Sequence, residues 1–243
     1  MYLNTKKGGG NVSNHWYAVL LKYLPEGIVR YISKGLVNKF IDKYADIELE
    51  GMENIKDLEK PIIFISNHLS NADGIVLNKI LEKEDVTFVA GIKLSQNKFT
   101  NLGRYVVKTI TITPNSADKD AMSSIIKKLK DGNNVLMFPE GTRSRTGGML
   151  EARRGILLIQ KLSKAKIVPI GICGSEKMLP INDEGMEKEK FHHAKVGVKI
   201  GKPIEMLLKE KDEDRHAFEA RAMKHVMGSI AELLPEAYRG VYK

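Results

Sequence analysis

A histidine and an aspartate five residues apart are the first residues whose types and spacing could do chemistry. The apolar run Ile62–Ile65 is followed by Ser66, Asn67 and His68, and Asp73 comes five positions later. On one continuous helix a five-residue step turns through about 140°, so the two side chains would not share a face. They can meet only if His68 lies in the turn before a helix and Asp73 in its first turn. Ser70 and Asp73 have the spacing of a capping-box variant, which predicts this arrangement.

Paired in this way, the two residues could act on a hydroxyl. A carboxylate bonded to one imidazole nitrogen fixes the tautomer, and the other nitrogen can then remove a proton from a substrate. The structural alternative is that Asp73 only caps its helix and His68 is an ordinary loop residue. The spacing alone favours this alternative, whereas the position at a strand-to-helix turn makes the two interpretations comparable.

A second polar cluster follows the apolar run Val135–Phe138. It reads Pro139, Glu140, Gly141, Thr142, Arg143 and Ser144. Proline ends a strand because it lacks an N–H, and glycine permits a tight turn with close approach of a substrate. The planar guanidinium of arginine suits a phosphate, and the two hydroxyls can add hydrogen bonds. The alternative is a solvated polar turn.

Both clusters require a scaffold of strands and helices to bring them together. Apolar, β-branched runs predict strands at 47–49, 62–65, 86–89, 109–113, 135–138, 167–172 and 196–200. Helical patterns lie at 73–83, 117–130, 151–164 and about 213–234. Alternating strands and helices predict an α/β domain with a mostly parallel central sheet flanked by helices. Such sheets carry their working loops at the carboxyl ends of the strands, where both clusters fall.

Composition narrows the classes of function. The chain has 243 residues, with 39 Lys and Arg against 30 Asp and Glu, so anionic partners are expected. A single cysteine, Cys173, excludes an intrachain disulfide and a cysteine-built zinc site. His192 and His193 lack further ligands at suitable spacing, so we expect no metal site. The sequence contains no run of 18 uncharged apolar residues, so we expect no transmembrane helix.

The first 44 residues differ from the remainder of the chain. Residues 4–14 are polar and glycine-rich and predict a flexible arm. Residues 15–44 have apolar residues at helical spacing, and Pro25 and Gly35 predict breaks that leave two short helices. Residues 1–43 hold seven Lys and Arg against two acids. We therefore predict a membrane-associating segment at 1–44 and an α/β domain at 45–243. The alternative is that these helices pack on the core or form a dimer contact.

Taken together, in this order and about 70 residues apart, the two clusters resemble a known family. The sequence is similar to the glycerolipid acyltransferases of the lysophosphatidic acid acyltransferase (PlsC-like) type. Their N-H-x-x-x-x-D motif is matched by Asn67, His68 and Asp73, and their F-P-E-G-T-R-S motif by Phe138–Ser144. A V-P-I strand is matched by Val168–Ile170. The resemblance covers about residues 46–205.

The resemblance implies a reaction without a cofactor. His68, oriented by Asp73, would deprotonate the sn-2 hydroxyl of 1-acylglycerol 3-phosphate (lysophosphatidic acid). That oxygen would take the acyl group from acyl-CoA or acyl carrier protein and give phosphatidic acid. Residues 140–144 would bind substrate, and the enzyme would sit on the cytoplasmic face of the membrane as a peripheral protein.

One departure from the family pattern concerns the acceptor head group. Pro114 stands where the family's second motif usually has an arginine for the acceptor phosphate. Lys93 aligns with a basic residue often found upstream and is the candidate to bind the phosphate with Arg143, and Lys98, Arg104 or Lys108 could substitute for it. The open alternatives are glycerol 3-phosphate or another lysolipid as acceptor, a lipid esterase, and a non-catalytic membrane-binding module. No motif indicates nucleic-acid binding.

Overall fold

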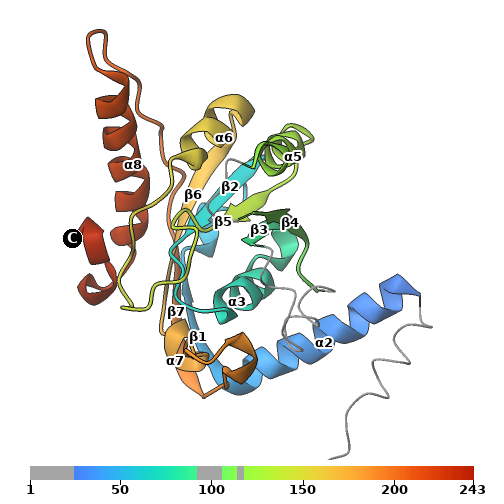
Figure 1. Cartoon of the computed structure of the whole chain (residues 1–243). Coiled ribbons are helices and arrows are strands. Elements are labelled where there is room, and N and C mark those ends of the chain that lie inside the picture. Colours follow the sequence, from blue (N-terminus) through green and yellow to red (C-terminus); the bar gives the residue numbers. More distant parts are fainter. Residues whose placement is uncertain (1–24, 92–105, 114–117) are drawn as a thin grey trace, which may run out of the picture.

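A single seven-stranded sheet organises the chain, in the order β1-β7-β6-β2-β5-β3-β4 (Figure 1). The computed structural model describes residues 25–91, 106–113 and 118–243. The strands are β1 Ala45–Glu50, β2 Ile62–Ser66, β3 Thr87–Gly91, β4 Thr109–Ile112, β5 Val135–Met137, β6 Lys166–Cys173 and β7 Ala194–Ile200. All seven predicted strands are present.

Strand direction changes once across the sheet. The five strands from β6 to β4 run parallel to one another. β7 is antiparallel to β6, with Ile170 opposite Ile200, and β1 runs parallel to β7. The prediction of a mostly parallel sheet is therefore confirmed. In the parallel part, the carboxyl ends of β2 and β5 lie at the same edge, so the two polar clusters are delivered to one place.

Helices cover both faces of the sheet (Figure 1). They are α2 Glu26–Tyr44, α3 Ala72–Ile80, α5 Lys119–Lys130, α6 Gly155–Ser163, α7 Ser175–Met178 and α8 Arg215–Ala231, with short 3₁₀ helices η1 Met52–Asn54, η2 Glu82–Glu84, η4 Met186–Lys188, η5 Glu236–Tyr238 and η6 Gly240–Tyr242. Phe64 packs in the core cluster shared with α2, α3 and α7, whereas Ile63 and Ile65 pack with α5, α6 and α8. Every residue of β2 is buried, which explains its continuous apolar run.

The N-terminal prediction is correct in part. Gly35 does not break the helix, because α2 continues from Glu26 to Tyr44. A glycine inside a helix costs only about 1 kcal/mol relative to alanine, and Val37 and Ile41 of α2 are buried in the core. The first of the two predicted helices and the predicted arm lie outside the described residues. The boundary at residue 44 stays a prediction.

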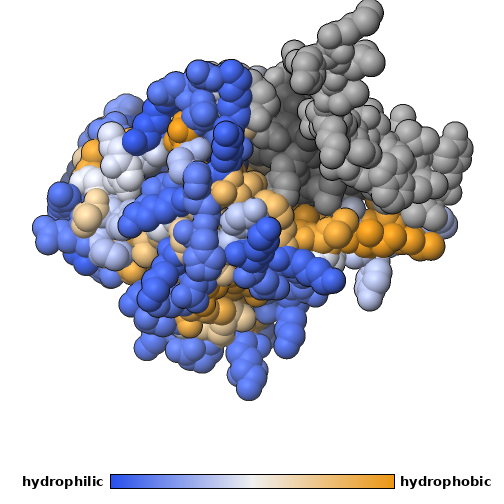
Figure 2. Space-filling view, turned by 90° about the horizontal axis from the view of Figure 1, so that it is seen from below, coloured by the Kyte–Doolittle hydropathy of each residue, from blue (hydrophilic) through white to orange (hydrophobic). Residues whose placement is uncertain are grey.

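The outer face of α2 is apolar. Its exposed side chains include Ile28, Tyr31, Ile32 and Leu36, which recur at helical spacing. Figure 2 shows a hydrophobic band on the side of the molecule that carries α2. In the part of the chain that the structure describes, no helix is both long enough and apolar enough to cross a membrane.

Candidate active site

The imidazole of His68 is bonded to Asp73. Nδ1 of His68 lies 2.8 Å from Oδ2 of Asp73, as the motif predicts. The His68 ring stacks on Phe138 with centroids 4.1 Å apart and an angle of 16°. The Asp73 side chain is fully buried, whereas that of His68 is 19% exposed. With Nδ1–H donating to the carboxylate, Nε2 keeps its lone pair for a proton from a ligand.

The same oxygen of Asp73 orders the turn that carries His68. Oδ2 also accepts the backbone N–H groups of Leu69 at 2.7 Å and Ser70 at 2.9 Å. The Oγ of Ser70 accepts the N–H of Ala72 at 3.1 Å. Only the Asp73-to-Ser70 half of a capping box is present, because the hydroxyl of Ser70 accepts from Ala72 and the N–H of Asp73 donates to the backbone carbonyl of Ser70. The regular helix begins at Ala72, with Asn71 as its N-cap. The helix cap and the His68–Asp73 pair are thus one structure, and the two interpretations of the motif do not compete.

Asn67 fixes the position of His68 at the end of β2. Its side-chain amide donates to the carbonyl of Ile172 at 2.8 Å and accepts the N–H of Ile172 at 2.9 Å. Asn67 is completely buried. The amide therefore pairs with the backbone of the neighbouring strand β6, and His68 starts directly beyond this anchor.

Glu140 joins the two motifs. Its Oε1 accepts the backbone N–H of His68 at 2.9 Å, and its Oε2 accepts that of Leu150 at 2.8 Å. Burial raises the pKa of Glu140 to about 7, against the opposite effect of these two N–H donors. Glu140 was predicted to bind substrate, but these contacts give it the geometry of a clamp between backbone segments.

Two other residues of the second cluster also shape the loop. The N–H of Ser144 donates to the carbonyl of His68 at 2.8 Å, and its hydroxyl donates to the carbonyl of Gly148. Gly141 has φ +71, and a Cβ there would lie 2.9 Å from Nε of Arg153. Only glycine suits both the conformation and the space. Thr142 is exposed.

Arg143 is held by an acid that the sequence did not reveal. Its Nη1 lies 2.6 Å from Oε1 of Glu189, whose side chain is 1% exposed. Oε2 of Glu189 accepts from the side-chain amide of Asn71 at 2.8 Å. Glu189 stands in the run Glu187–Lys190, whose alternating charges are typical of a solvated face, yet its side chain is buried. Its burial comes from tertiary contacts that no local pattern encodes.

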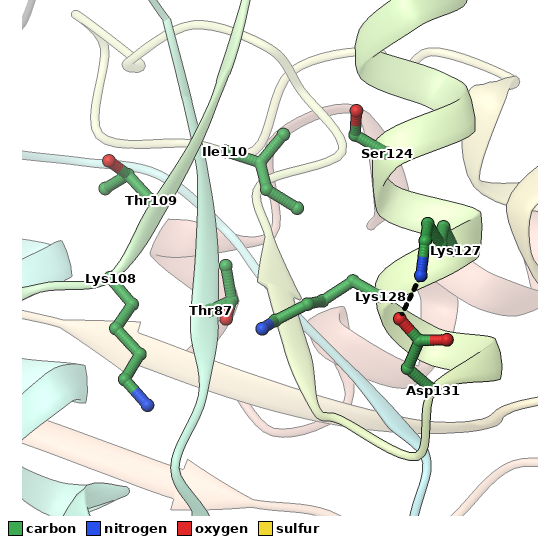
Figure 3. Close-up of a pocket in the computed structure, with 8 residues that line it drawn as sticks. All are labelled: Thr87, Lys108, Thr109, Ile110, Ser124, Lys127, Lys128 and Asp131. Carbon is green, nitrogen blue, oxygen red and sulfur yellow. Dashed lines mark hydrogen bonds and ion pairs between the residues drawn. The ribbon is translucent and has the colours of Figure 1, made fainter.

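Several sequence candidates lie outside the described residues, namely Lys93, Pro114 and the basic residues Lys98 and Arg104. Lys108, by contrast, lies within the described residues, and its Nζ forms an ion pair with Oδ1 of Asp85 at 2.5 Å. It lines the groove of about 480 Å³ shown in Figure 3, between β3, β4 and α5. Thr87 and Thr109 in that groove begin their strands. The groove is therefore at the amino ends of the parallel strands, opposite His68, and is not part of the candidate site.

The described residues include no group of three or more histidine, cysteine or acidic side chains that could hold a metal ion. Burial raises the pKa of Cys173, so its thiol is poorly suited to act as a nucleophile. The chemistry available at this site is that of the His68 imidazole and the donors around it.

This fold and this site define an α/β protein that holds an imidazole against a buried carboxylate at the carboxyl end of β2. Its fold is that of a solved structure, the 1-acyl-sn-glycerophosphate acyltransferase PlsC from Thermotoga maritima, with a TM-score of 0.61. The match covers 90% of this chain and 89% of that one at 21% identity.

Comparisons with sequence families and curated proteins identify the family. The Acyltransferase family model matches residues 46–173, and the chain belongs to this family. It is 28% identical over 196 residues to the chloroplast 1-acyl-sn-glycerol-3-phosphate acyltransferase LPAT1 of Arabidopsis thaliana, covering 79% of this chain and 53% of that protein.

Bacterial relatives carry the same name. Over 174 residues the chain is 25% identical to the 1-acyl-sn-glycerol-3-phosphate acyltransferase of Escherichia coli, covering 70% of this chain and 67% of that protein. Over 161 residues it is 28% identical to that of Bacillus subtilis, covering 65% and 73%. The chain spans about half the length of the plant proteins it matches.

Proposed function

We propose that this protein is a 1-acylglycerol-3-phosphate O-acyltransferase that uses His68 as its general base. The observation that carries the proposal is the contact between His68 Nδ1 and Asp73 Oδ2 at 2.8 Å, with the ring partly open to solvent. Family membership and the names of the relatives support the substrate class.

The reaction needs no covalent enzyme intermediate. Nε2 of His68 takes the proton of the sn-2 hydroxyl while its oxygen attacks the carbonyl carbon of an acyl thioester. The C–O bond forms, the C–S bond breaks, and the proton passes from His68 to the departing thiolate of coenzyme A or acyl carrier protein. Asp73 stabilises the imidazolium while it exists. General-base catalysis of this kind contributes about 10²–10⁴-fold.

Arg143 is the described residue best suited to the acceptor phosphate. The residue that follows it in the loop, Ser144, donates its backbone N–H to the carbonyl of His68. A guanidinium beside the base would bind the phosphate and present the hydroxyl to Nε2. Lys93 stays a candidate for the same phosphate. The alternative acceptors, glycerol 3-phosphate and other lysolipids, differ in how they place a phosphate relative to the reacting hydroxyl.

We place the protein on the cytoplasmic surface of the membrane, because lysophosphatidic acid and phosphatidic acid are membrane lipids. The exposed apolar face of α2 supports this position, since Ile28, Ile32 and Leu36 lie on the same helix as Arg30 and Lys39. Apolar side chains would enter the interface, and each cation near an anionic leaflet adds about 1 kcal/mol.

Thiol release and product formation test the proposal together. Palmitoyl-CoA is incubated with the protein and vesicles, with and without lysophosphatidic acid, and both free thiol and phosphatidic acid are measured. We expect thiol release to depend on the acceptor and to match phosphatidic acid formation mole for mole. Release of free palmitate at a rate independent of acceptor would instead identify an esterase. Absence of release with every donor and acceptor would favour a binding module.

A further inference from the structure

Glu189 lies at the centre of a closed set of contacts around His68. Its two carboxylate oxygens bind Arg143 at 2.6 Å and Asn71 at 2.8 Å. Asn71 is three residues after His68, and Arg143 directly precedes Ser144, whose N–H donates to the carbonyl of His68. One side chain therefore links the turn of the first motif to the loop of the second.

The free-energy cost of burying the Glu189 carboxylate indicates the role of the Glu189–Arg143 ion pair. A buried carboxylate loses its hydration, and a buried ion pair regains little net stability in return. Such a pair does restrict a long side chain to one geometry. Glu189 holds Arg143 through Nη1, and no other acid among the described residues pairs with Arg143. The guanidinium has five N–H donors, so those on Nε and Nη2 remain for a ligand.

Glu189 is itself fixed by the segment that carries it. Two residues further along, Phe191 packs edge-on against Phe40 of α2, with ring centroids 4.5 Å apart. The backbone N–H of His192 donates to the carbonyl of Met178 at 2.8 Å. The segment between α7 and β7 is thus anchored to both α2 and α7, close to the position of Glu189.

We propose that Glu189 is a positioning residue that orients Arg143 toward the phosphate of the acceptor and so selects phosphorylated acceptors. This inference rests on the proposed function and extends it to a residue in the segment between α7 and β7. An oriented guanidinium needs to lose less side-chain freedom when the phosphate binds. Replacing Glu189 should therefore weaken binding of the acceptor more than binding of the acyl donor.

The test compares Glu189→Ala, Glu189→Gln and the control Glu184→Gln in steady-state kinetics. Glu184 belongs to the same segment but pairs with Lys188 at the surface, so its variant should behave as wild type. We expect Glu189→Ala to raise the KM for lysophosphatidic acid about tenfold, the effect of losing one charge-assisted contact. The KM for palmitoyl-CoA should stay within about twofold. Glu189→Gln retains an acceptor for Arg143 and should show partial rescue.

Glu189→Ala is also made in an Arg143→Ala background, which distinguishes an effect through Arg143 from a general structural effect of Glu189. If Glu189 acts through Arg143, Glu189→Ala adds little once Arg143 is absent. Equal losses in both backgrounds, or parallel losses in kcat and donor KM, would overturn the inference. A lower acceptor KM in Glu189→Ala would also overturn it, because Glu189 would then compete with the phosphate. An inactive wild type would refute the proposed function instead.

Discussion

The backbone N–H of His68 donates to the carboxylate of Glu140 at 2.9 Å, and this bond joins two motifs that lie about 70 residues apart in the sequence. The other carboxylate oxygen of Glu140 accepts the backbone N–H of Leu150, so the Glu140 side chain connects the turn after β2 to the loop after β5. A carboxylate with both oxygens occupied by backbone donors fixes two segments at once. The His68 ring consequently stands on a support built from both motifs.

Titration of Glu140 should make the free energy of unfolding depend on pH. Because burial raises its pKa from 4.5 to about 7, the native state holds a proton between these pH values and the unfolded state does not. The free energy of unfolding should therefore fall by about 3 kcal/mol as pH rises through this range. Glu140→Gln does not titrate and gives the baseline. Urea unfolding of both proteins from pH 4.5 to 8 measures the difference, and an increase with pH would show that the two N–H donors outweigh burial.

Asp73→Asn should separate catalysis from folding. The amide oxygen can still accept from Leu69 and Ser70, so the turn should survive. The same amide oxygen would also accept from Nδ1 of His68, but a neutral amide does not stabilise the imidazolium that forms when Nε2 takes a proton. The base would then be weaker, and we expect kcat to fall by about 10²-fold or more. The measurement is acceptor-dependent thiol release at matched circular dichroism, and near-normal kcat would contradict the role of the Asp73 charge.

Gly240 should be required for the geometry of the site, although it lies far from His68 in the sequence. It has φ +54, and a Cβ there would lie 2.1 Å from the carbonyl oxygen of Met149, next to Leu150. Gly240→Ala should move this loop, weaken the Leu150–Glu140 bond and lower both stability and kcat. Gly132→Ala is the matched control, because Gly132 has φ +81 but no atom within 4 Å. It should lose about 1 kcal/mol without loss of kcat. Equal effects of the two variants on kcat would contradict this role.

The apolar face of α2 should determine membrane binding. Ile32→Asp combined with Leu36→Asp places charges on side chains that are 40% and 54% exposed, so folding should be preserved. Binding to anionic vesicles should fall about tenfold or more in sedimentation, because two of the exposed apolar side chains of α2 are replaced by charges. Leu208→Asp is the control, since Leu208 is 86% exposed but lies outside α2. An equal loss in the control would indicate a non-specific effect of charge.

The sequence was sufficient for the features that depend on local pattern. The buried strand β2 has apolar residues on both faces, so its run was recognisable. Ser70 and Asp73 located the start of the helix to within one residue, because the N-cap is Asn71. The direction of β7 was not recognisable, because its alternation of buried and exposed residues is the same in either direction. Its reversal is decided by pairing with β6.

The features that the sequence concealed depend on contacts between distant segments. Glu189 lies in an alternating Glu-Lys run, and contacts of its segment with α2 and α7 place it beside Arg143. Gly35 suggested a break in α2, yet burial of Val37 and Ile41 outweighs the intrinsic cost of a helical glycine. The sequence predicted Glu140 as a substrate-binding residue, whereas its contacts with the backbone of His68 and Leu150 became visible only in the structure.

The most direct test of the account is acyl transfer by His68→Ala. Phosphatidic acid formation from palmitoyl-CoA and lysophosphatidic acid is measured on vesicles, with circular dichroism and vesicle binding recorded for both proteins. We expect the variant to fold and bind vesicles as wild type does, with acceptor-dependent transfer lowered by about 10²–10⁴-fold. Transfer at the wild-type rate by the folded variant would contradict the assignment of His68 as the base.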